Sequence, residues 1–97
     1  MFRHCVMFRF NSNVDPATVT AIESQLAELA RLPMVRGYQY GPDAQLAEGN
    51  FDYVLVADFD DVAGYQAYAV DAQHQRVLKD YLRPNIADRA AVQYALD

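Results

Sequence analysis

The stretch that decides the fold is FDYVLVADF, residues 51–59. Tyr53 and every second residue after it are apolar, and the residues between them include the apolar Val54 and Val56. This pattern predicts a β-strand, because successive side chains of a strand point to opposite faces of its sheet. Since both faces of the strand are apolar at its centre, we expect both faces of the sheet to be covered.

The other segments follow from periodicity and from helix and turn signals. The predicted elements are strands over 2–10, 34–40 and 89–96, a helix over 16–31, a polar loop over 41–50, and a helical region from 60 or 61 to Pro84. Asp15 followed by Pro16 is a usual N-cap and first turn, and it predicts where the first helix begins. With residues 51–59, the prediction is four strands and two helical regions in one short chain.

The second helical region is expected to be broken near Asp71. The apolar stripe of its first half contains Val62, Tyr65, Ala69 and Ala72. The stripe of its second half contains His74, Val77, Leu78 and Tyr81, and it is displaced in helical phase from the first. Two short helices that meet near Asp71 would produce this shift.

The predicted order is strand, helix, strand, strand, helix pair, strand, which is the βαββαβ sandwich of the α+β ferredoxin-like folds. Both helical regions then cover the same face of the sheet. The other face carries Cys5, Met7, Val54 and Val56. An apolar sheet face of that extent normally finds a partner, and a second copy is the simplest one. We therefore expect a homodimer through the sheet face, forming a dimeric α+β barrel.

The composition favours a single domain over residues 1–97. Eight Lys and Arg stand against 13 Asp and Glu, and the scattered basic residues make nucleic acid and anionic membranes poor partners. No apolar run is long enough to span a bilayer, and the N-terminus does not resemble a signal peptide, so a cytoplasmic location is expected. The lone Cys5 fits a reducing compartment and is interpreted as a packing residue.

Neither a cofactor nor a metal is expected. The four glycines form no phosphate-binding or dinucleotide-binding motif. The two histidines, His4 and His74, have no carboxylates at a recognisable metal-ligand spacing. The tyrosines and phenylalanines instead favour a small apolar or aromatic ligand.

Three stretches together resemble the stress-responsive dimeric α+β barrel (Dabb) domain family over almost the whole chain. They are residues 3–10, residues 52–59, and Tyr65-Gln66-Ala67-Tyr68 leading to His74. The resemblance implies a dimer with a pocket between sheet and helices. One plant member of the family is a cofactor-independent polyketide cyclase that closes its substrate by an aldol reaction, using a His and a Tyr in that pocket.

By this resemblance, His74 and Tyr68 match the catalytic histidine and tyrosine. His4 matches another pocket histidine, and Tyr53 stands where the plant enzyme has a further histidine. The family usually has His-Pro where this chain has Asp71-Ala72. Because of this difference, the resemblance supports a shared substrate less than it supports a shared pocket.

The chemistry of His74 and Tyr68 suits aldol or enol reactions. An imidazole takes and returns a proton near neutral pH, and a tyrosine hydroxyl donates a hydrogen bond to a developing oxyanion. On one straight helix, residues six apart point about 120° away from each other. The break expected near Asp71 would allow them to converge. The residues expected to contact ligand are His4, Val6, Phe8, Tyr53, Leu55, Tyr65, Val77 and Tyr94.

The residues leave three functions open. The first is a cofactor-independent cyclase, lyase or isomerase. The second is a non-catalytic, ligand-binding stress-response dimer, and the third is a cofactor-independent monooxygenase of the antibiotic-biosynthesis type. Purely structural roles also remain open, with His74 bonded to a backbone carbonyl or a carboxylate and His4 as a core histidine.

Overall fold

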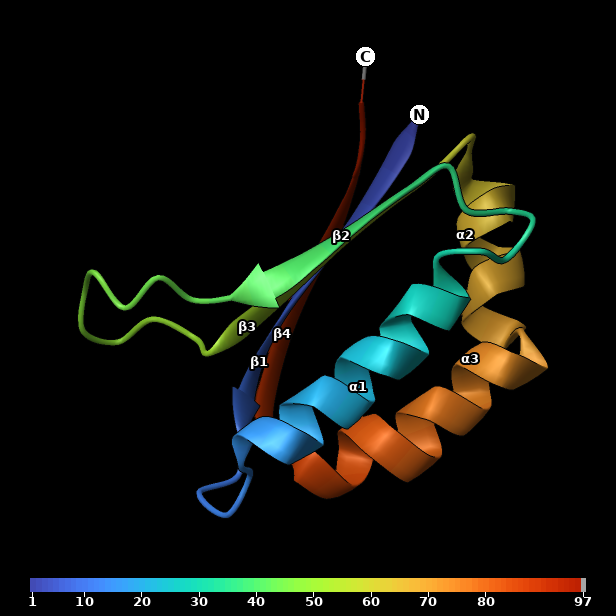
Figure 1. The fold of residues 1–97 in the computed structure, drawn as a ribbon. Coiled ribbons are helices and arrows are strands. Elements are labelled where there is room, and N and C mark those ends of the chain that lie inside the picture. The colour runs from blue at the N-terminus through green and yellow to red at the C-terminus, as the bar shows by residue number, and fades with distance from the viewer. Residues whose placement is uncertain (97) are drawn as a thin grey trace.

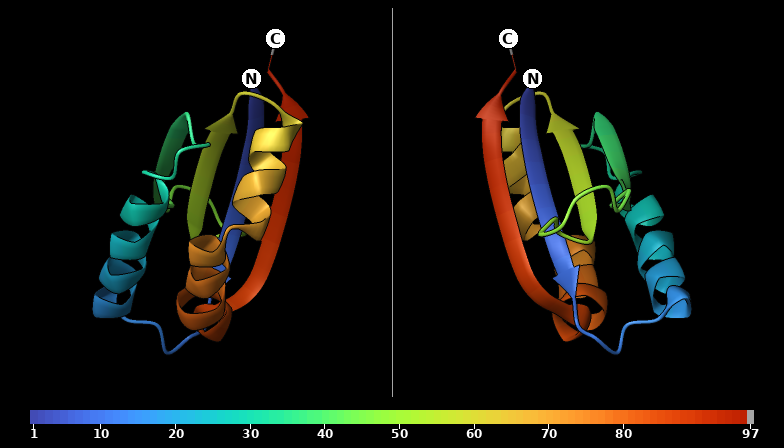
Figure 2. Two further views of the ribbon diagram at one scale, coloured as in Figure 1. Left: turned by 90° about the vertical axis from the view of Figure 1, so that its right-hand side faces the viewer. Right: turned by 90° about the vertical axis from the view of Figure 1, so that its left-hand side faces the viewer.

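A computed structural model describes residues 1–96 and has the ferredoxin-like α+β fold expected from the sequence. Its elements are β1 (Phe2–Phe10), α1 (Pro16–Leu29), β2 (Gly37–Pro42), β3 (Tyr53–Phe59), α2 (Val62–Val70), α3 (Ala72–Val77), a π-helical turn (Leu78–Leu82), a 3₁₀ turn (Arg83–Asn85) and β4 (Ile86–Ala95). The four strands form an antiparallel sheet in the order β2-β3-β1-β4. All three α-helices lie against one face of the sheet (Figures 1 and 2).

Several predicted boundaries are corrected by local hydrogen bonding. The helix predicted to reach residue 31 ends at Leu29, because Arg31 and Leu32 donate to carbonyls three residues back, as in a tight turn. The strand predicted over 34–40 begins at Gly37 and continues to Pro42, since Val35 still donates to the Leu32 carbonyl in a further turn. The last strand begins at Ile86, three residues earlier than expected, and pairs with Phe10 across an irregularity in the ladder.

An aspartate side chain caps the N-terminus of each of the two longer helices, α1 and α2. The side chain of Asp15 accepts from the backbone N–H of Thr18 at 2.8 Å, and Pro16 occupies the first turn, as predicted. Asp61 accepts from the N–H of Gly64 at 2.9 Å at the start of α2. Each carboxylate satisfies an N–H that the helix itself leaves without a partner.

The predicted break of the second helical region is confirmed at Asp71. Its backbone is extended, with φ −59° and ψ 135°, so α2 ends and α3 starts in a new direction. The Asp71 carboxylate then accepts from the N–H groups of Gln73 at 2.9 Å and His74 at 3.1 Å. One residue therefore both ends α2 and fixes the first turn of α3.

The sheet has one covered face and one open face. His4, Val6 and Phe8 of β1 are buried on the helix side, together with the inward side chains of β3. Met7, Val54 and Val92 point to the other side, where they are 41%, 38% and 60% exposed. Among residues 1–96 no helix covers that side, and the loop between β2 and β3 reaches only one end of it (Figure 2).

No helix among the described residues has the length and apolar character needed to cross a membrane.

Candidate functional site

A cavity of about 520 Å³ lies between the inner face of the sheet and the helices. Its apolar walls are Val6, Phe8, Leu26, Leu29, Leu55, Ala69, Leu78, Leu82 and Ile86. Its polar groups are His4, Tyr38, Tyr65, Tyr68, His74, Gln75, Arg83 and Arg89. An apolar chamber with a few converging polar groups is the usual form of a small-molecule site.

His74 lies in the cavity wall, and the orientation of its imidazole ring is set by a contact with the backbone. Its Nδ1 lies 3.4 Å from the backbone carbonyl oxygen of Ala69, and a carbonyl only accepts hydrogen bonds. We therefore assign the ring proton to Nδ1, which leaves Nε2 with a lone pair. Burial lowers the pKa of His74 below its ordinary value. The bond to Ala69 and the Asp71 carboxylate act to raise this pKa, but their effect is smaller. At neutral pH the ring is uncharged and able to take a proton.

Tyr68 lies directly against His74. The two ring centroids are 4.0 Å apart, and Tyr68 is only 1% exposed. Its hydroxyl lies 2.7 Å from the hydroxyl of Tyr38 on β2. Burial raises the pKa of Tyr68 to about 12 and raises that of Tyr38 further, while the bond from Tyr38 acts to lower the pKa of Tyr68. We assign Tyr38 as the donor, because the bond acts to raise the pKa of Tyr38 and to lower that of Tyr68. The Tyr68 proton is then available to another acceptor.

His4 is the second imidazole of the cavity and is 6% exposed. Gln93 Nε2 lies 3.0 Å from His4 Nδ1, and an amide nitrogen donates, so we assign the His4 proton to Nε2. Burial, then the positive charge of Arg89, and then the charge that His74 carries when it is protonated, lower the pKa of His4 to about 4. The cavity thus holds one imidazole that presents a hydrogen-bond donor and another that presents an acceptor.

Most of the predicted site residues converge on this cavity. His4, Val6, Phe8, Leu55, Tyr65, Tyr68 and His74 all line it. Tyr53 and Val77 are buried core residues outside its wall. Tyr53 borders the second hollow described below, and its hydroxyl donates to the Glu23 carboxylate on α1. These two residues belong to the core that supports the cavity.

The structure corrects the predicted placement of Tyr94. Tyr94 pairs with Arg3 in the β1–β4 ladder and is 44% exposed on the open face of the sheet. Its neighbour Gln93 pairs with His4 and points toward the helices, where it bonds His4 and lies 3.4 Å from the Tyr65 hydroxyl. The side of β4 that carries Gln93 therefore faces the cavity, and the side that carries Tyr94 faces away from it.

Sequence reasoning missed several polar groups of the cavity. They are Tyr38, Gln75, Arg83 and Arg89 in the wall, and Gln93 beside it. Tyr38 lies within a segment predicted as a strand, but nothing in the sequence marks its hydroxyl as part of a site. Arg89 and Gln93 pair with the inward residues Phe8 and His4, and this register is known only from the structure.

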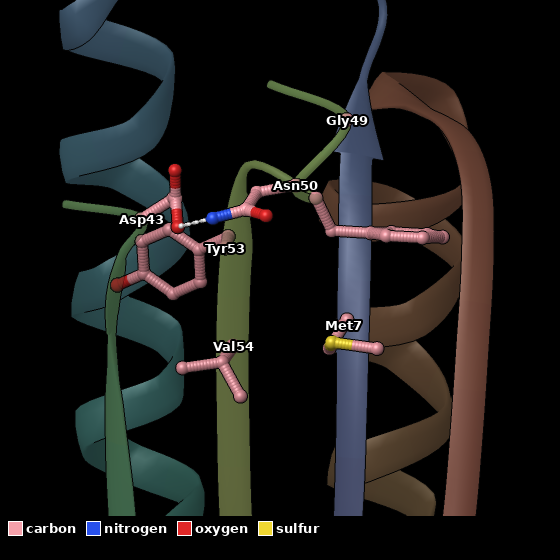
Figure 3. Close-up of a pocket in the computed structure, with 7 residues that line it drawn as sticks. Met7, Asp43, Gly49, Asn50, Tyr53 and Val54 are labelled. Carbon is pink, nitrogen blue, oxygen red and sulfur yellow. Dashed lines mark hydrogen bonds between the residues drawn. The ribbon is translucent and has the colours of Figure 1, made fainter. Parts of the chain in front are cut away.

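A second, smaller hollow of about 340 Å³ lies on the open face of the sheet, beside the loop between β2 and β3. Figure 3 shows Met7 and Val54 projecting from β1 and β3 toward it, with Asp43 and Asn50 of the loop at its edge. The side-chain amide of Asn50 donates to the Asp43 carboxylate at 3.1 Å. Neither histidine lines this hollow, which extends the apolar open face.

The described residues contain no group of three His, Cys, Asp or Glu side chains placed to hold a metal ion.

Comparison with solved structures identifies relatives with the same fold. A dimeric ferredoxin-like protein of unknown function from Thermobifida fusca is 40% identical, with 98% of this chain and 90% of that chain covered and a TM-score of 0.90. A Dabb family protein from Mesorhizobium loti is 16% identical, with 98% and 95% covered and a TM-score of 0.85. A hydroxynitrile lyase from Passiflora edulis is 17% identical, with 99% and 93% covered and a TM-score of 0.87. At such identities the last two show the fold alone.

No curated protein matches the chain. A family model does match: that of the stress responsive A/B barrel domain, over residues 2–96. The match spans almost the whole sequence and agrees with the 40% identical relative. The chain therefore belongs to the stress responsive A/B barrel domain (Dabb) family.

Proposed function

We propose that the protein binds a small apolar or aromatic carbonyl compound in the cavity and catalyses proton transfer on it, as a cyclase or lyase. The observation that carries this proposal is the fixed orientation of His74. Its Nδ1 is bonded to the Ala69 carbonyl and its ring lies against Tyr68, so Nε2 is the nitrogen left for a substrate. The proposed chemistry needs only these side chains.

In the cyclase reaction, His74 Nε2 would remove a proton from a carbon next to a carbonyl group. The electron pair moves into an enolate, whose oxygen accepts a hydrogen bond from the Tyr68 hydroxyl. The enolate carbon then attacks a second carbonyl carbon of the same molecule and forms a carbon–carbon bond. The new alkoxide takes the proton back from His74, which restores the neutral imidazole.

A lyase would use the same groups in the opposite direction. His74 would take the proton of a hydroxyl, the adjacent carbon–carbon bond would break, and the carbanion released would be protonated by His74. A lowered pKa supports both directions, because the imidazole is uncharged at neutral pH and ready to act as a base.

Hydrogen–deuterium exchange tests this role before the natural substrate is known. The probe is 2-acetylnaphthalene, whose methyl protons exchange slowly in D₂O, followed by proton NMR. We expect the protein to accelerate exchange, and His74→Gln to return the rate to within about a factor of two of the protein-free rate, since general-base catalysis contributes roughly 10²–10⁴-fold. Tyr68→Phe should slow exchange partially.

The matched control is Arg76→Gln, an exposed residue of α3 outside the cavity wall, which should exchange the probe at the wild-type rate. Exchange that persists unchanged in His74→Gln would refute the assignment of the base. Binding of the probe without any acceleration would favour the non-catalytic ligand-binding dimer. Oxygen uptake with a quinol would favour the monooxygenase.

The open face of the sheet supports a homodimer as part of the same proposal. Met7, Val54 and Val92 form an exposed apolar surface on three adjacent strands, and covering it removes that apolar area from water. The 40% identical Thermobifida fusca protein is described as dimeric. A second copy of this chain is therefore the proposed occupant.

Sedimentation equilibrium tests the dimer. We expect a mass of about twice the 11.0 kDa of one chain at micromolar concentration, and one chain's mass for Val54→Lys. The control is Val70→Lys, because Val70 is 76% exposed on α2, away from the open face. A wild-type protein of single-chain mass would refute this part of the proposal.

A further inference from the structure

Two arginines stand out among the polar groups of the cavity. Arg89 projects inward from β4 at the position paired with Phe8, and Arg83 lies in the turn that leads into β4. Both residues line the cavity and both are exposed, whereas its apolar walls are largely buried. The two guanidinium groups therefore lie at the opening rather than at the bottom.

Neither guanidinium has an anionic partner among residues 1–96. The ion pairs found within residues 1–96 are Arg3 with Asp58 and Arg36 with Asp60. No side-chain hydrogen bond from Arg83 or Arg89 is found in that same part of the chain. The protein has a net charge of −5, yet no carboxylate of residues 1–96 forms an ion pair with either arginine of this opening.

The other polar groups of the cavity do not supply the missing negative charge. The charge of Arg89 acts to lower the pKa of His4, and that of Arg83 acts to lower the pKa of His74, so each arginine acts electrostatically on one of the histidines. Burial keeps the Tyr38 and Tyr68 hydroxyls protonated at neutral pH. The cavity is thus apolar and neutral inside and positive at its mouth.

We propose that the ligand is an apolar or aromatic carboxylic acid, whose carboxylate is bound by Arg83 and Arg89 at the opening while its apolar body enters the cavity. This ligand class rests on the proposed function, because it assumes that the cavity is the binding site. A guanidinium matches a carboxylate with two parallel N–H donors, which fixes direction as well as charge. The acid group would remain at the mouth, and the reacting carbon would lie further in, beside His74.

Calorimetric titration with 2-naphthoate and 2-naphthamide tests the ligand class. The two probes share an aromatic body and differ in charge. We expect 2-naphthoate to bind at least about tenfold more tightly, since charge-assisted hydrogen bonds are roughly twice as strong as neutral ones. Inorganic phosphate, which has the charge without the aromatic body, should bind at least about tenfold more weakly than 2-naphthoate.

The double variant Arg83→Gln/Arg89→Gln should lose the preference for 2-naphthoate and keep the affinity for 2-naphthamide. Arg83→Lys/Arg89→Lys should retain part of the preference. Lysine keeps the positive charge but lacks the two parallel N–H donors of the guanidinium. Arg76→Gln is again the control, expected to behave as wild type. It removes one positive charge at an exposed residue of α3 outside the cavity wall.

The outcomes separate this inference from the proposed function. Equal binding of both naphthyl probes, or an unchanged preference in the double Gln variant, would refute binding of an acid group at the opening. Neither result would affect the proposals that the cavity binds a ligand and that His74 is the base. A clear acid preference without His74-dependent exchange of 2-acetylnaphthalene would refute the catalytic role alone. Failure of both naphthyl probes to bind, or phosphate binding as tightly as 2-naphthoate, would refute the proposed ligand class.

Discussion

The imidazole of His74 lies against the phenol ring of Tyr68, with 4.0 Å between ring centroids and 33° between ring planes. The two residues are six positions apart, so on a continuous helix they would point about 120° away from each other. The extended backbone of Asp71 between α2 and α3 brings them together. The geometry of the candidate site therefore depends on a residue that does not line the cavity.

Asp71→Ala should weaken both the fold and the site. The substitution removes the acceptor for the backbone N–H groups of Gln73 and His74, and losing such a cap costs about 0.5–2 kcal/mol. Without the cap the first turn of α3 loosens and His74 moves relative to Tyr68. We expect lower stability in urea, shifted His74 ring signals in NMR, and weaker binding of 2-acetylnaphthalene.

Asp61→Ala is the matched control for that effect. Asp61 caps α2 through the N–H of Gly64 and has no bond to α3. Its loss should cost a similar free energy of unfolding while leaving the His74 signals unchanged. Equal disturbance of His74 in both variants would show that Asp71 has no special role in placing the imidazole.

Tyr68→Phe should destabilise the protein by about 1–2 kcal/mol, because it leaves the buried Tyr38 hydroxyl without its partner. Tyr40→Phe is the control, since the Tyr40 hydroxyl forms no hydrogen bond within residues 1–96, and its loss should change stability by less than about 0.5 kcal/mol. Urea unfolding at one fixed protein concentration measures both values. Equal stability of the two variants would mean that the Tyr38–Tyr68 bond is not stabilising.

The sequence was sufficient to predict the order of the elements and the break at Asp71. Both depend on local periodicity. The apolar residues before and after Asp71 follow different helical phases, because the helix direction changes at that residue. In the strand predicted over residues 2–10, alternate side chains share a face, and the structure buries His4, Val6 and Phe8 together on the helix side.

The inward side of β4 could not be predicted in the same way. Its apolar residues Val92 and Tyr94 lie on the open face, while Arg89 and Gln93 face the cavity. Alternation shows which residues share a face, but which face the helices cover depends on pairing with β1. An apolar stripe normally marks the core, and here it marks the surface proposed for dimerisation.

Stability should fall as the pH drops from about 6.5 to 4, because the native and unfolded chains bind protons differently at His4. Burial lowers the native pKa of His4 from 6.5 to about 4, so in this window the unfolded chain binds a proton that the native one does not. From His4 alone we expect about 2 kcal/mol less stability near pH 5 than near pH 7. The lowered pKa of His74 acts in the same direction.

His4→Gln isolates the contribution of His4. Urea unfolding near pH 7 and pH 5 should show a smaller pH dependence in the variant by about 2 kcal/mol, with His74 and the carboxylates unchanged. An equal loss of stability in wild type and variant would show that His4 does not stay neutral in the native state.

Gln93→Glu should reverse the shift at His4. The Gln93 amide now donates to His4 Nδ1 at 3.0 Å, and a carboxylate there would instead accept a hydrogen bond from the Nδ1–H of the charged imidazolium. An opposite charge at that distance favours the charged form by about 1–3 pKa units, so NMR titration should show the His4 pKa well above 4. Gln66→Glu adds the same charge at an exposed residue of α2 outside the cavity wall and should leave the His4 pKa unchanged. If both substitutions moved the His4 pKa equally, net charge rather than the contact with Gln93 would control the protonation of His4.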